Sequence, residues 1–165
     1  MGSLRRICVI AILAALMGSA LSMESYGSEA VYKDMVFGVG KSGEYSSFHT
    51  GTDQRAVASI YVRRPGNKVA FHFPQITEDQ VAELWPNASS KNLAGEIVYS
   101  RGGNLDSNFG FAQGKLVACS LNSIADLEIG PSANGEFISF PAKQRDVHRI
   151  FGKPLKHNSY RRART

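Results

Sequence analysis

Acidic and histidine side chains are the groups in this chain that could move protons or bind a metal ion. Asp126 and Glu128 lie two residues apart in an apolar run, so on a strand they would share one face. Paired carboxylates can perform acid–base chemistry, as in glycosidases, but this alternation is more typical of the solvated face of a half-buried strand. The histidines, which lack the spacing of metal ligands, are His49, His72, His148 and His157. We therefore expect no catalytic residue, no metal and no cofactor at these positions.

A glycine-rich string could bind a phosphate group. Residues 38–43 match the pattern G-x-G-x-x-G, which binds a pyrophosphate only where it opens a helix after a strand. The following residues, 44–52, have no helical period, and Met35 stands where a P-loop requires its first glycine. We therefore interpret the string as a flexible turn and expect no nucleotide site.

The first 22 residues predict export from the cytoplasm. Arg5 and Arg6 form a short basic start, residues 7–17 are an unbroken apolar run, and small residues follow. Signal peptidase accepts only small side chains at the first and third positions before its cut, so we expect cleavage after Ala20 or Ser22. An uncleaved anchor fits less well, because about 16 apolar residues fall short of the roughly 20 that span a bilayer. The sequence thus predicts a signal peptide over residues 1–22 and a protein released to the periplasm or the extracellular space.

Only one cysteine, Cys119, lies beyond this signal peptide, because Cys8 falls within it. An internal disulfide could then not form, although exported proteins often depend on them. The neighbours of Cys119 are mostly apolar, in the sequence KLVACSL at residues 115–121. This setting favours a buried thiol over a catalytic nucleophile.

The basic charge of the chain is concentrated at its ends. The net charge is +5, and loss of Arg5 and Arg6 with the signal peptide leaves +3. Five Lys or Arg side chains fall within residues 153–165, which contain no acidic residue, so residues 23–152 carry a net charge of −2. Nucleic acid is therefore not an expected partner, because it requires a positive face on the fold itself. We interpret residues 153–165 as a basic tail that frays, with contact to anionic lipid or to an acidic protein as a secondary role.

Short apolar runs separated by turn residues predict an antiparallel sheet. Residues 55–63 and 68–73 flank Arg64-Pro65-Gly66-Asn67, which suits a tight turn, so we expect a hairpin there. Asn134-Gly135 predicts a second hairpin, with residues 136–140 as its return strand. The other expected strands are residues 31–39, 95–100, 108–111, 115–121 and 124–129.

Two short helices are expected to cover this sheet. The first starts at a capping box in residues 77–80, ends before Pro86, and should bury Trp85 against the sheet. The second would begin at Pro141 and end at Gly152. Its apolar stripe consists of Val147, Ile150 and Phe151.

The domain organisation follows from these elements. Residues 31–152 contain no internal repeat, low-complexity tract or linker, which favours one domain. Residues 23–30 are small and polar and are expected to form a flexible leader. The predicted fold class is α+β, with an antiparallel sheet of about five to seven strands covered by two short helices.

Residues 142–154, AKQRDVHRIFGKP, resemble a motif of the BamE (SmpA/OmlA) family of small outer-membrane assembly lipoproteins. In that motif a helix with an apolar stripe ends in leucine-glycine-x-proline before a β-hairpin. The residues that fit it are Asp146, Val147, Ile150, Phe151, Gly152 and Pro154. The chain departs from the family in having no lipid-bearing cysteine and only 11 residues after Pro154. The resemblance implies an α+β fold of the cell envelope.

Export, small size and the lack of a catalytic motif favour a non-catalytic domain that binds another secreted or envelope protein, as inhibitors and immunity proteins do. Recognition residues tend to lie on polar loops of a rigid sheet, here residues 40–53 and 101–108. The expected contacts are Tyr45, Phe48, His49, Arg101 and Asn104. One alternative is an envelope-assembly or scaffold component. Another is a small hydrolase of an envelope polymer, whose site would join Asp126 or Glu128 to a histidine in the fold.

Overall fold

A computed structural model describes residues 27–52, 54–101 and 107–159, which form two antiparallel sheets and two α-helices. The predicted α+β class and the two helices are confirmed. The prediction of one sheet with five to seven strands is wrong, because the strands divide into a sheet of eight and a sheet of four. The expected signal peptide, residues 1–22, lies outside the described residues.

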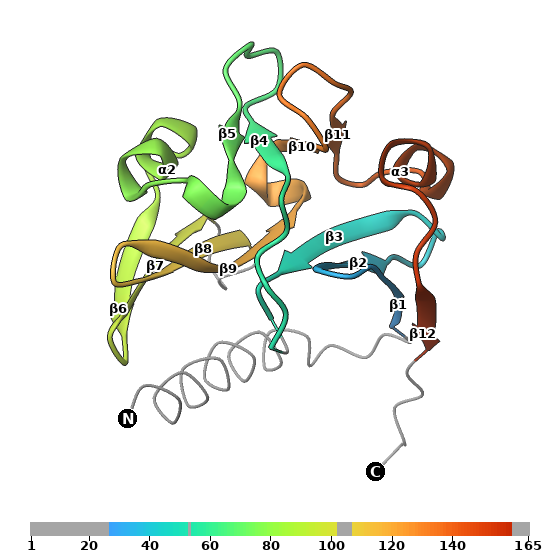
Figure 1. Cartoon of the computed structure of the whole chain (residues 1–165), viewed down its shortest axis with the longest axis horizontal. Coiled ribbons are helices and arrows are strands. Elements are labelled where there is room, and N and C mark those ends of the chain that lie inside the picture. Colours follow the sequence, from blue (N-terminus) through green and yellow to red (C-terminus); the bar gives the residue numbers. More distant parts are fainter. Residues whose placement is uncertain (1–26, 53, 102–106, 160–165) are drawn as a thin grey trace.

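The larger sheet has the strand order β12-β1-β2-β3-β9-β8-β7-β6, and every neighbouring pair is antiparallel. Its strands are β1 (Ser28–Val31), β2 (Met35–Val39), β3 (Tyr45–Thr50), β6 (Ser89–Leu93), β7 (Glu96–Arg101), β8 (Ser107–Ala112), β9 (Lys115–Asn122) and β12 (Lys156–Ser159). The first and last described strands of the chain therefore lie side by side at one edge of this sheet (Figure 1).

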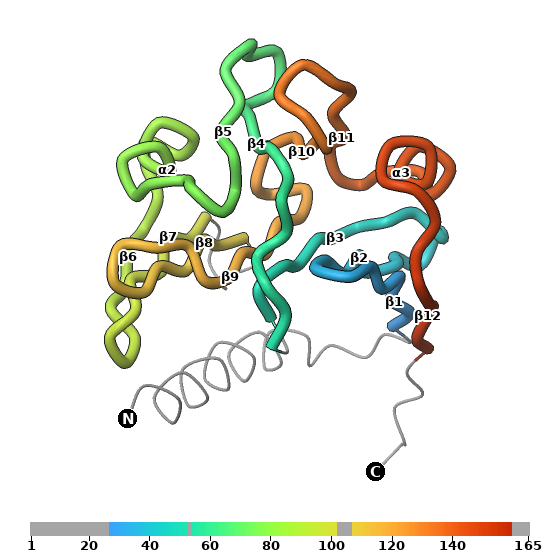
Figure 2. The backbone as a smooth tube through the Cα atoms, in the orientation of Figure 1, coloured from blue at the N-terminus to red at the C-terminus, as the bar shows by residue number. Residues whose placement is uncertain are grey.

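The smaller sheet has the order β11-β10-β4-β5 and is also antiparallel. Its strands are β4 (Tyr61–Arg63), β5 (Phe71–His72), β10 (Glu128–Gly130) and β11 (Ile138–Ser139). The two predicted hairpins form, since β4 pairs with β5 and β10 pairs with β11. Their strands are shorter than predicted, and their connections, residues 64–70 and 131–137, are longer than the tight turns that the sequence indicated. Figure 2 shows the chain running past the end of β3 and then climbing to β4, which is how it passes from one sheet to the other.

Both helices lie over the same face of the larger sheet, one toward each end, with the smaller sheet between them (Figure 1). They are α2 (Glu78–Leu84) and α3 (Gln144–Phe151). A continuous row of aromatic rings fills the core between these layers, with ring centroids 4.8 to 6.0 Å apart. The row consists of Phe151, Phe37, Phe48, Phe73, Phe109 and Trp85. Neither helix is long and apolar enough to cross a bilayer, and the same holds for the rest of the described chain.

Helix α2 starts as its sequence predicts. The Thr77 hydroxyl accepts a hydrogen bond from the Gln80 backbone N–H, and the Gln80 side chain accepts one from the Thr77 N–H. Trp85 at its end is buried, and its indole N–H donates to the carbonyl of Ala125 over 2.8 Å. This bond satisfies the one polar atom of the indole, so the ring can lie in the core at no cost in hydrogen bonding.

Helix α3 starts three residues later than predicted. Pro141, which follows a cis peptide bond, is not its first residue, because Ala142 is instead paired with Tyr45 as an isolated bridge. Two backbone hydrogen bonds of 2.8 Å hold that pair, and they keep the chain extended until Lys143. The helix ends at Gly152, as expected, with a φ of +81° that suits glycine.

Both predicted flexible ends of the domain contribute strands. Ser28–Val31 pairs with Lys156–Ser159. The first segment was expected to lie partly in a flexible leader at residues 23–30, and the second in a basic tail at residues 153–165. The two segments satisfy each other's backbone groups, so neither needs an apolar run of its own to become a strand. The predicted strand at residues 31–39 is divided between two strands. β1 ends at Val31 and β2 begins at Met35, and the tight turn between them is closed by a hydrogen bond from Tyr32 N–H to the Met35 carbonyl.

Two further segments differ from the sequence interpretation. Strand β6 was not expected, because its sequence is polar. It pairs with β7, and the two strands are connected by a turn of Ala94 and Gly95, which both have positive φ. The predicted strand at residues 124–129 begins only at Glu128, since Ser123–Ala125 is a 3-10 turn (η2) and Asp126 has a left-handed backbone with φ of +51°. The other predicted strands, in β7, β8 and β9, are confirmed with ends shifted by at most one residue.

Candidate functional site

The four described residues among the five expected to contact a partner do not form one surface. Tyr45 and Phe48 are fully buried on β3, which pairs with β2 and β9 on its two sides, so their assignment as contacts is wrong. His49, on the same strand, has its Nδ1 2.9 Å from the Ser120 hydroxyl. Arg101 ends β7, is exposed, and donates a hydrogen bond to the carbonyl of Ala125. Asn104 lies outside the described residues.

The glycine string at residues 38–43 forms a hairpin turn and not a phosphate cradle. It connects β2 directly to β3, where a nucleotide site would need a helix. The turn is closed by hydrogen bonds from Gly40 N–H to the Glu44 carbonyl and from Gly43 N–H to the Gly40 carbonyl. The prediction of a turn is therefore confirmed, although the segment after it is a strand.

The two candidate carboxylates do not lie on the same strand. Asp126 lies on a left-handed turn, whereas Glu128 lies on β10, where it accepts a hydrogen bond of 2.9 Å from the Arg63 guanidinium. That guanidinium also lies 3.8 Å from the ring centroid of Phe137. The prediction that Asp126 and Glu128 share one strand face is therefore wrong. Within the described residues no group of His, Cys, Asp or Glu could hold a metal ion.

Cys119 is fully buried on β9, as the sequence predicts. Burial raises the pKa of its thiol well above the usual value, because the thiolate would lose its hydration in the core. The side chain therefore acts as a small apolar group.

Three of the four histidines each lie next to a hydroxyl group. His49 lies next to Ser120, His72 next to Ser59, and His148 next to Tyr45, each pair at 2.9 Å. The partners in these contacts lie 13, 71 and 103 residues apart in the sequence. Sequence spacing could not reveal them, because the partners come together only when the sheets form.

One of these pairs has the connectivity of a nucleophile and a base. The Ser59 hydroxyl lies 2.9 Å from His72 Nε2, and the other ring nitrogen, Nδ1, contacts the Gln75 side-chain oxygen. With the Gln75 oxygen next to Nδ1, the tautomer protonated at Nδ1 leaves Nε2 able to accept from Ser59. The Tyr61 ring packs on His72, with centroids 4.9 Å apart. Ser59 and Gln75 are exposed, and the amide of Gln75 orients the ring without the charge of a carboxylate.

The pair on α3 is more buried. Tyr45 has no exposed surface, and burial raises the pKa of its phenol. Burial lowers the pKa of His148, and the charges of His157 and Lys153 lower it further. Both shifts favour the uncharged forms, so a neutral tyrosine and a neutral histidine share this hydrogen bond. The pair therefore anchors α3 to the sheet.

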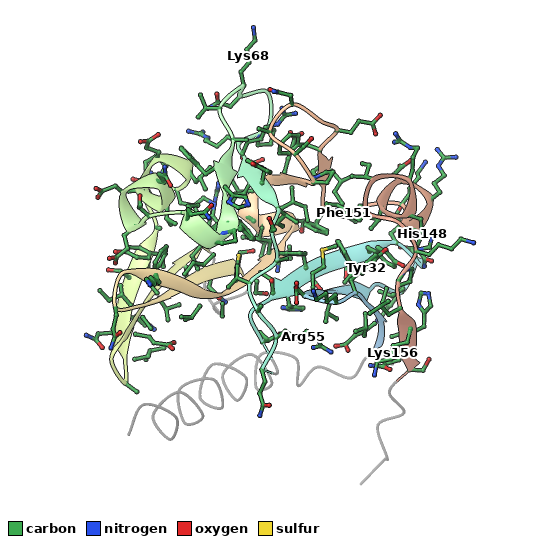
Figure 3. All side chains as sticks on the ribbon, viewed as in Figure 1. Tyr32, Arg55, Lys68, His148, Phe151 and Lys156 are labelled. Atoms are coloured by element: carbon green, nitrogen blue, oxygen red, sulfur yellow. The ribbon has the colours of Figure 1, made fainter. Side chains whose placement is uncertain are left out.

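The most uneven charge distribution lies on α3 and β12. Residues 143–159 carry five Lys or Arg side chains and one acidic residue, a net charge of +4. The other described residues carry nine basic and ten acidic side chains, a net charge of −1. Figure 3 shows His148 and Lys156 on the same side of the molecule, on α3 and beside β12. We call this region the α3–β12 corner; it consists of Lys143, Arg145, Arg149, Lys153, Leu155, Lys156 and His157.

Much of the positive charge at this corner is not neutralised. Lys143, Lys153 and Lys156 are exposed and form no ion pair within the described part of the chain. Arg149 contacts the carboxylates of Glu136 and Asp146. The lysines at 153 and 156 were visible in the sequence, but they were assigned to a frayed tail and not to a folded surface.

An apolar side chain lies within this basic surface. Leu155 is 75 % exposed, more than any other large hydrophobic residue of the described chain. Its backbone N–H donates to the Val31 carbonyl over 2.7 Å, so the residue is held in place at the start of β12. The lysines at 153 and 156 flank it in the sequence. A fixed, exposed leucine between cations is an arrangement that suits a protein contact.

Comparison with known proteins provides no family assignment: no family model matches the chain, and no curated protein or solved structure does either. The resemblance of residues 142–154 to the BamE family therefore stays a prediction.

Proposed function

We propose that this protein is exported and binds an acidic protein of the cell envelope or the extracellular space through the α3–β12 corner, as an inhibitor or immunity protein would. The observation that carries the proposal is the concentration of charge: a net +4 within residues 143–159, on a domain that is otherwise close to neutral. Such a field speeds the approach of a negatively charged partner and disfavours positively charged ones.

Leu155 would supply the apolar surface that is buried in the contact, which charge alone does not provide. Protein interfaces gain most of their affinity from a few apolar or aromatic residues that become fully buried, surrounded by polar residues that exclude water. Leu155 has the exposed surface to be buried, and the exposed residues Lys153 and Lys156, close to it in the sequence, would contribute to the polar surroundings. Burying its exposed side chain would contribute about 1 to 2 kcal/mol.

Charge reversal at the corner tests this proposal. Purified protein and a Lys153→Glu/Lys156→Glu variant are used as bait in pull-downs from cell-envelope extract. We expect the wild type to retain an acidic protein in about stoichiometric amount, and the variant to lose it. Lys68→Glu is the matched control, because Lys68 is an exposed lysine at the tip of the β4–β5 hairpin, away from the corner (Figure 3).

Two results would contradict the proposal. One is a partner that remains bound to the charge-reversed protein; the other is the absence of any stoichiometric partner. Association with vesicles of anionic lipid, and with outer membrane in cell fractions, would instead favour the envelope-assembly alternative. Export is checked separately by intact mass, since a product from the cell envelope or medium that still contains its first twenty residues would rule out signal cleavage.

A second function, a small hydrolase of esters on an envelope polymer, is favoured by Ser59, His72 and Gln75. In such a reaction His72 Nε2 takes the hydroxyl proton while Ser59 Oγ attacks the ester carbonyl carbon, and the departing alcohol receives that proton. Water then hydrolyses the acyl-serine and restores the hydroxyl. The support is the 2.9 Å contact of Ser59 with His72 Nε2 and the contact of Gln75 with the other ring nitrogen, Nδ1.

A covalent probe distinguishes this second function. We expect a fluorophosphonate to label one serine, with the mass increase on the peptide that contains Ser59, and we expect His72→Ala to abolish labelling. Ser139→Ala, at another exposed serine of the smaller sheet, is the control and should leave labelling unchanged. No labelling, or labelling that survives Ser59→Ala, would exclude the hydrolase.

A further inference from the structure

We propose that the α3–β12 corner binds its partner by adding a strand: an acidic β-strand of the partner pairs antiparallel or parallel with the free edge of β12. This inference rests on the proposed binding function and names the form that the partner takes. Strand addition supplies main-chain hydrogen bonds for affinity and side-chain contacts for specificity.

The edge of β12 has backbone groups available for pairing. In the described chain β12 is the outermost strand of the larger sheet and pairs only with β1. Tyr32 N–H bonds to the Met35 carbonyl, so by alternation the backbone groups of Ala30 and Ser28 also face β2. Those of Glu29 and Val31 then face β12.

The same alternation identifies the free groups on β12. Glu29 and Val31 lie opposite Asn158 and Lys156, so those two residues direct their backbone groups toward β1. His157 and Ser159, between and beyond them, direct their N–H and carbonyl groups away from the sheet. Both are exposed. The edge therefore presents two donor and acceptor pairs to an incoming strand.

Charge determines which strand can bind. Lys156 and His157 lie on β12 itself, with Lys153 and Leu155 just before it. Like charges directly opposite each other destabilise a strand pair, whereas opposite charges stabilise it. A second copy of this chain would place lysine near lysine, so the corner disfavours self-association through β12. An acidic strand with alternating apolar residues would satisfy both the lysines and Leu155.

The other sheet edges are less suitable. The edge strands of the smaller sheet, β5 and β11, have two residues each, too few for a stable pairing. Strand β6, at the far edge of the larger sheet, is longer, but it is mostly polar and carries a single lysine. Its residues are Ser89, Ser90, Lys91, Asn92 and Leu93. Only at β12 do a free edge, an excess of positive charge and a highly exposed leucine occur together.

Amide hydrogen exchange provides a direct test with a defined probe. The probe is an acetylated and amidated peptide of alternating glutamate and valine, and the comparison peptide is oligoglutamate of the same charge. We expect saturating probe to slow exchange at His157 and Ser159 by about tenfold or more. Exchange at Lys156 and Asn158 should change little, because their amides already bond to β1.

The outcomes separate this inference from the proposed function. Probe binding with the alternating protection supports strand addition. Equal binding of both peptides, without new protection on β12, overturns strand addition but retains the acidic partner at the corner. If neither peptide binds, strand addition is wrong, and the charge-reversal pull-down then decides the proposed function independently.

A proline substitution tests the same edge from the protein side. His157→Pro removes the outward N–H, and a proline whose N–H position faces solvent is tolerated in an edge strand. His157→Ala removes the imidazole only and is the matched control. We expect the proline variant to bind the probe about tenfold more weakly than the alanine variant, which corresponds to one lost hydrogen bond. Equal affinities would overturn the inference. If the proline variant does not fold, a probe N-methylated on the edge that faces β12 replaces it, and undiminished binding of that probe overturns the inference.

Discussion

The phenol oxygen of Tyr45 lies 2.9 Å from Nε2 of His148, and this contact joins β3 to α3. The two rings also meet edge to face, with centroids 5.9 Å apart. Because α3 carries much of the basic corner, the rigidity of the proposed binding surface depends on how firmly this helix is held. Phe151, which points from α3 into the aromatic row, is a further attachment, and Val147 of the same helix is fully buried in the core (Figure 3).

We expect Tyr45→Phe and His148→Ala to be coupled in stability. Each single change removes the same hydrogen bond, so the double variant should be less destabilised than the sum by about 1 kcal/mol. Urea unfolding followed by the emission of Trp85, the only tryptophan, measures this. The control pair is Tyr99→Phe with His148→Ala, since the Tyr99 hydroxyl donates to Glu78 and not to His148. Additive effects of Tyr45→Phe and His148→Ala would contradict the expectation.

The stability of the domain should depend on pH through His148. Burial, His157 and Lys153 lower the pKa of His148 below its usual value of 6.5, so the folded protein takes up this proton at a lower pH than the unfolded chain does. The contribution of His148 is therefore complete above about pH 6.5 and is lost as the pH falls below it. Tyr45, which also contacts His148, stays neutral over this range, because burial raises its pKa above 10.0.

His148→Gln tests this dependence, because glutamine can keep the bond to Tyr45 but does not titrate. We expect the free energy of unfolding of the wild type to decrease more steeply than that of the variant between pH 6.5 and pH 5. Urea titrations at half-unit steps of pH provide the comparison. Parallel curves for the two proteins would show that His148 does not contribute.

Glu96 should destabilise the folded protein at neutral pH. It is only 4 % exposed, one carboxylate oxygen has no hydrogen-bond partner among the described residues, and burial raises its pKa. The folded state therefore holds this proton to a higher pH than the unfolded chain, and stability falls as the pH rises through the raised pKa. We expect Glu96→Gln to increase the free energy of unfolding at pH 7.5 by about 1 kcal/mol.

The increase should be absent at pH 4, where most Glu96 side chains are protonated in both states. Glu83→Gln, at an exposed position on α2, is the matched control and should change stability little at either pH. A less stable Glu96→Gln protein at pH 7.5 would mean that the carboxylate has a partner which the expectation omits.

Gly51 should tolerate no side chain, for two separate reasons. Its φ is +72°, which favours glycine, and a methyl group there would collide with the carbonyl oxygen of Val117 on β9. Gly95 has a similar φ of +89° but no atom near the position of an added methyl group. We expect Gly95→Ala to cost about 1 kcal/mol and Gly51→Ala substantially more, which chemical denaturation measures. Equal losses would show that the collision is relieved without cost.

Elements with local signals were predictable from the sequence. Helix α2 is an example, because the bonds between Thr77 and Gln80 join residues three apart and require no other part of the chain. The turns at residues 38–43 and 64–67 belong to the same class, since Gly43 and Gly66 have the positive φ that glycine adopts without strain. The β10–β11 hairpin also forms, although neither Asn134 nor Gly135 has a positive φ.

Elements with distant partners were not predictable. Strands β1 and β12 lie at opposite ends of the domain, and each becomes a strand because the other satisfies its backbone groups. Tyr45 and Phe48 were expected on a polar loop, since the sequence YSSFHT has no long apolar run. Pairing of β3 with β2 and β9 places both rings in the core.

The sequence by itself determined the α+β class, the two helices, the buried thiol of Cys119 and the excess of positive charge near the end of the chain, because each depends on composition or on neighbours a few residues apart. Tertiary structure alone decided that this charge lies on a folded surface with an exposed leucine. It also decided that His148 meets Tyr45, that His72 meets Ser59, and that Asp126 lies outside the strand that holds Glu128. These relationships depend on strand pairings between segments far apart in the chain, and the free energy of such pairings is not encoded in either segment alone.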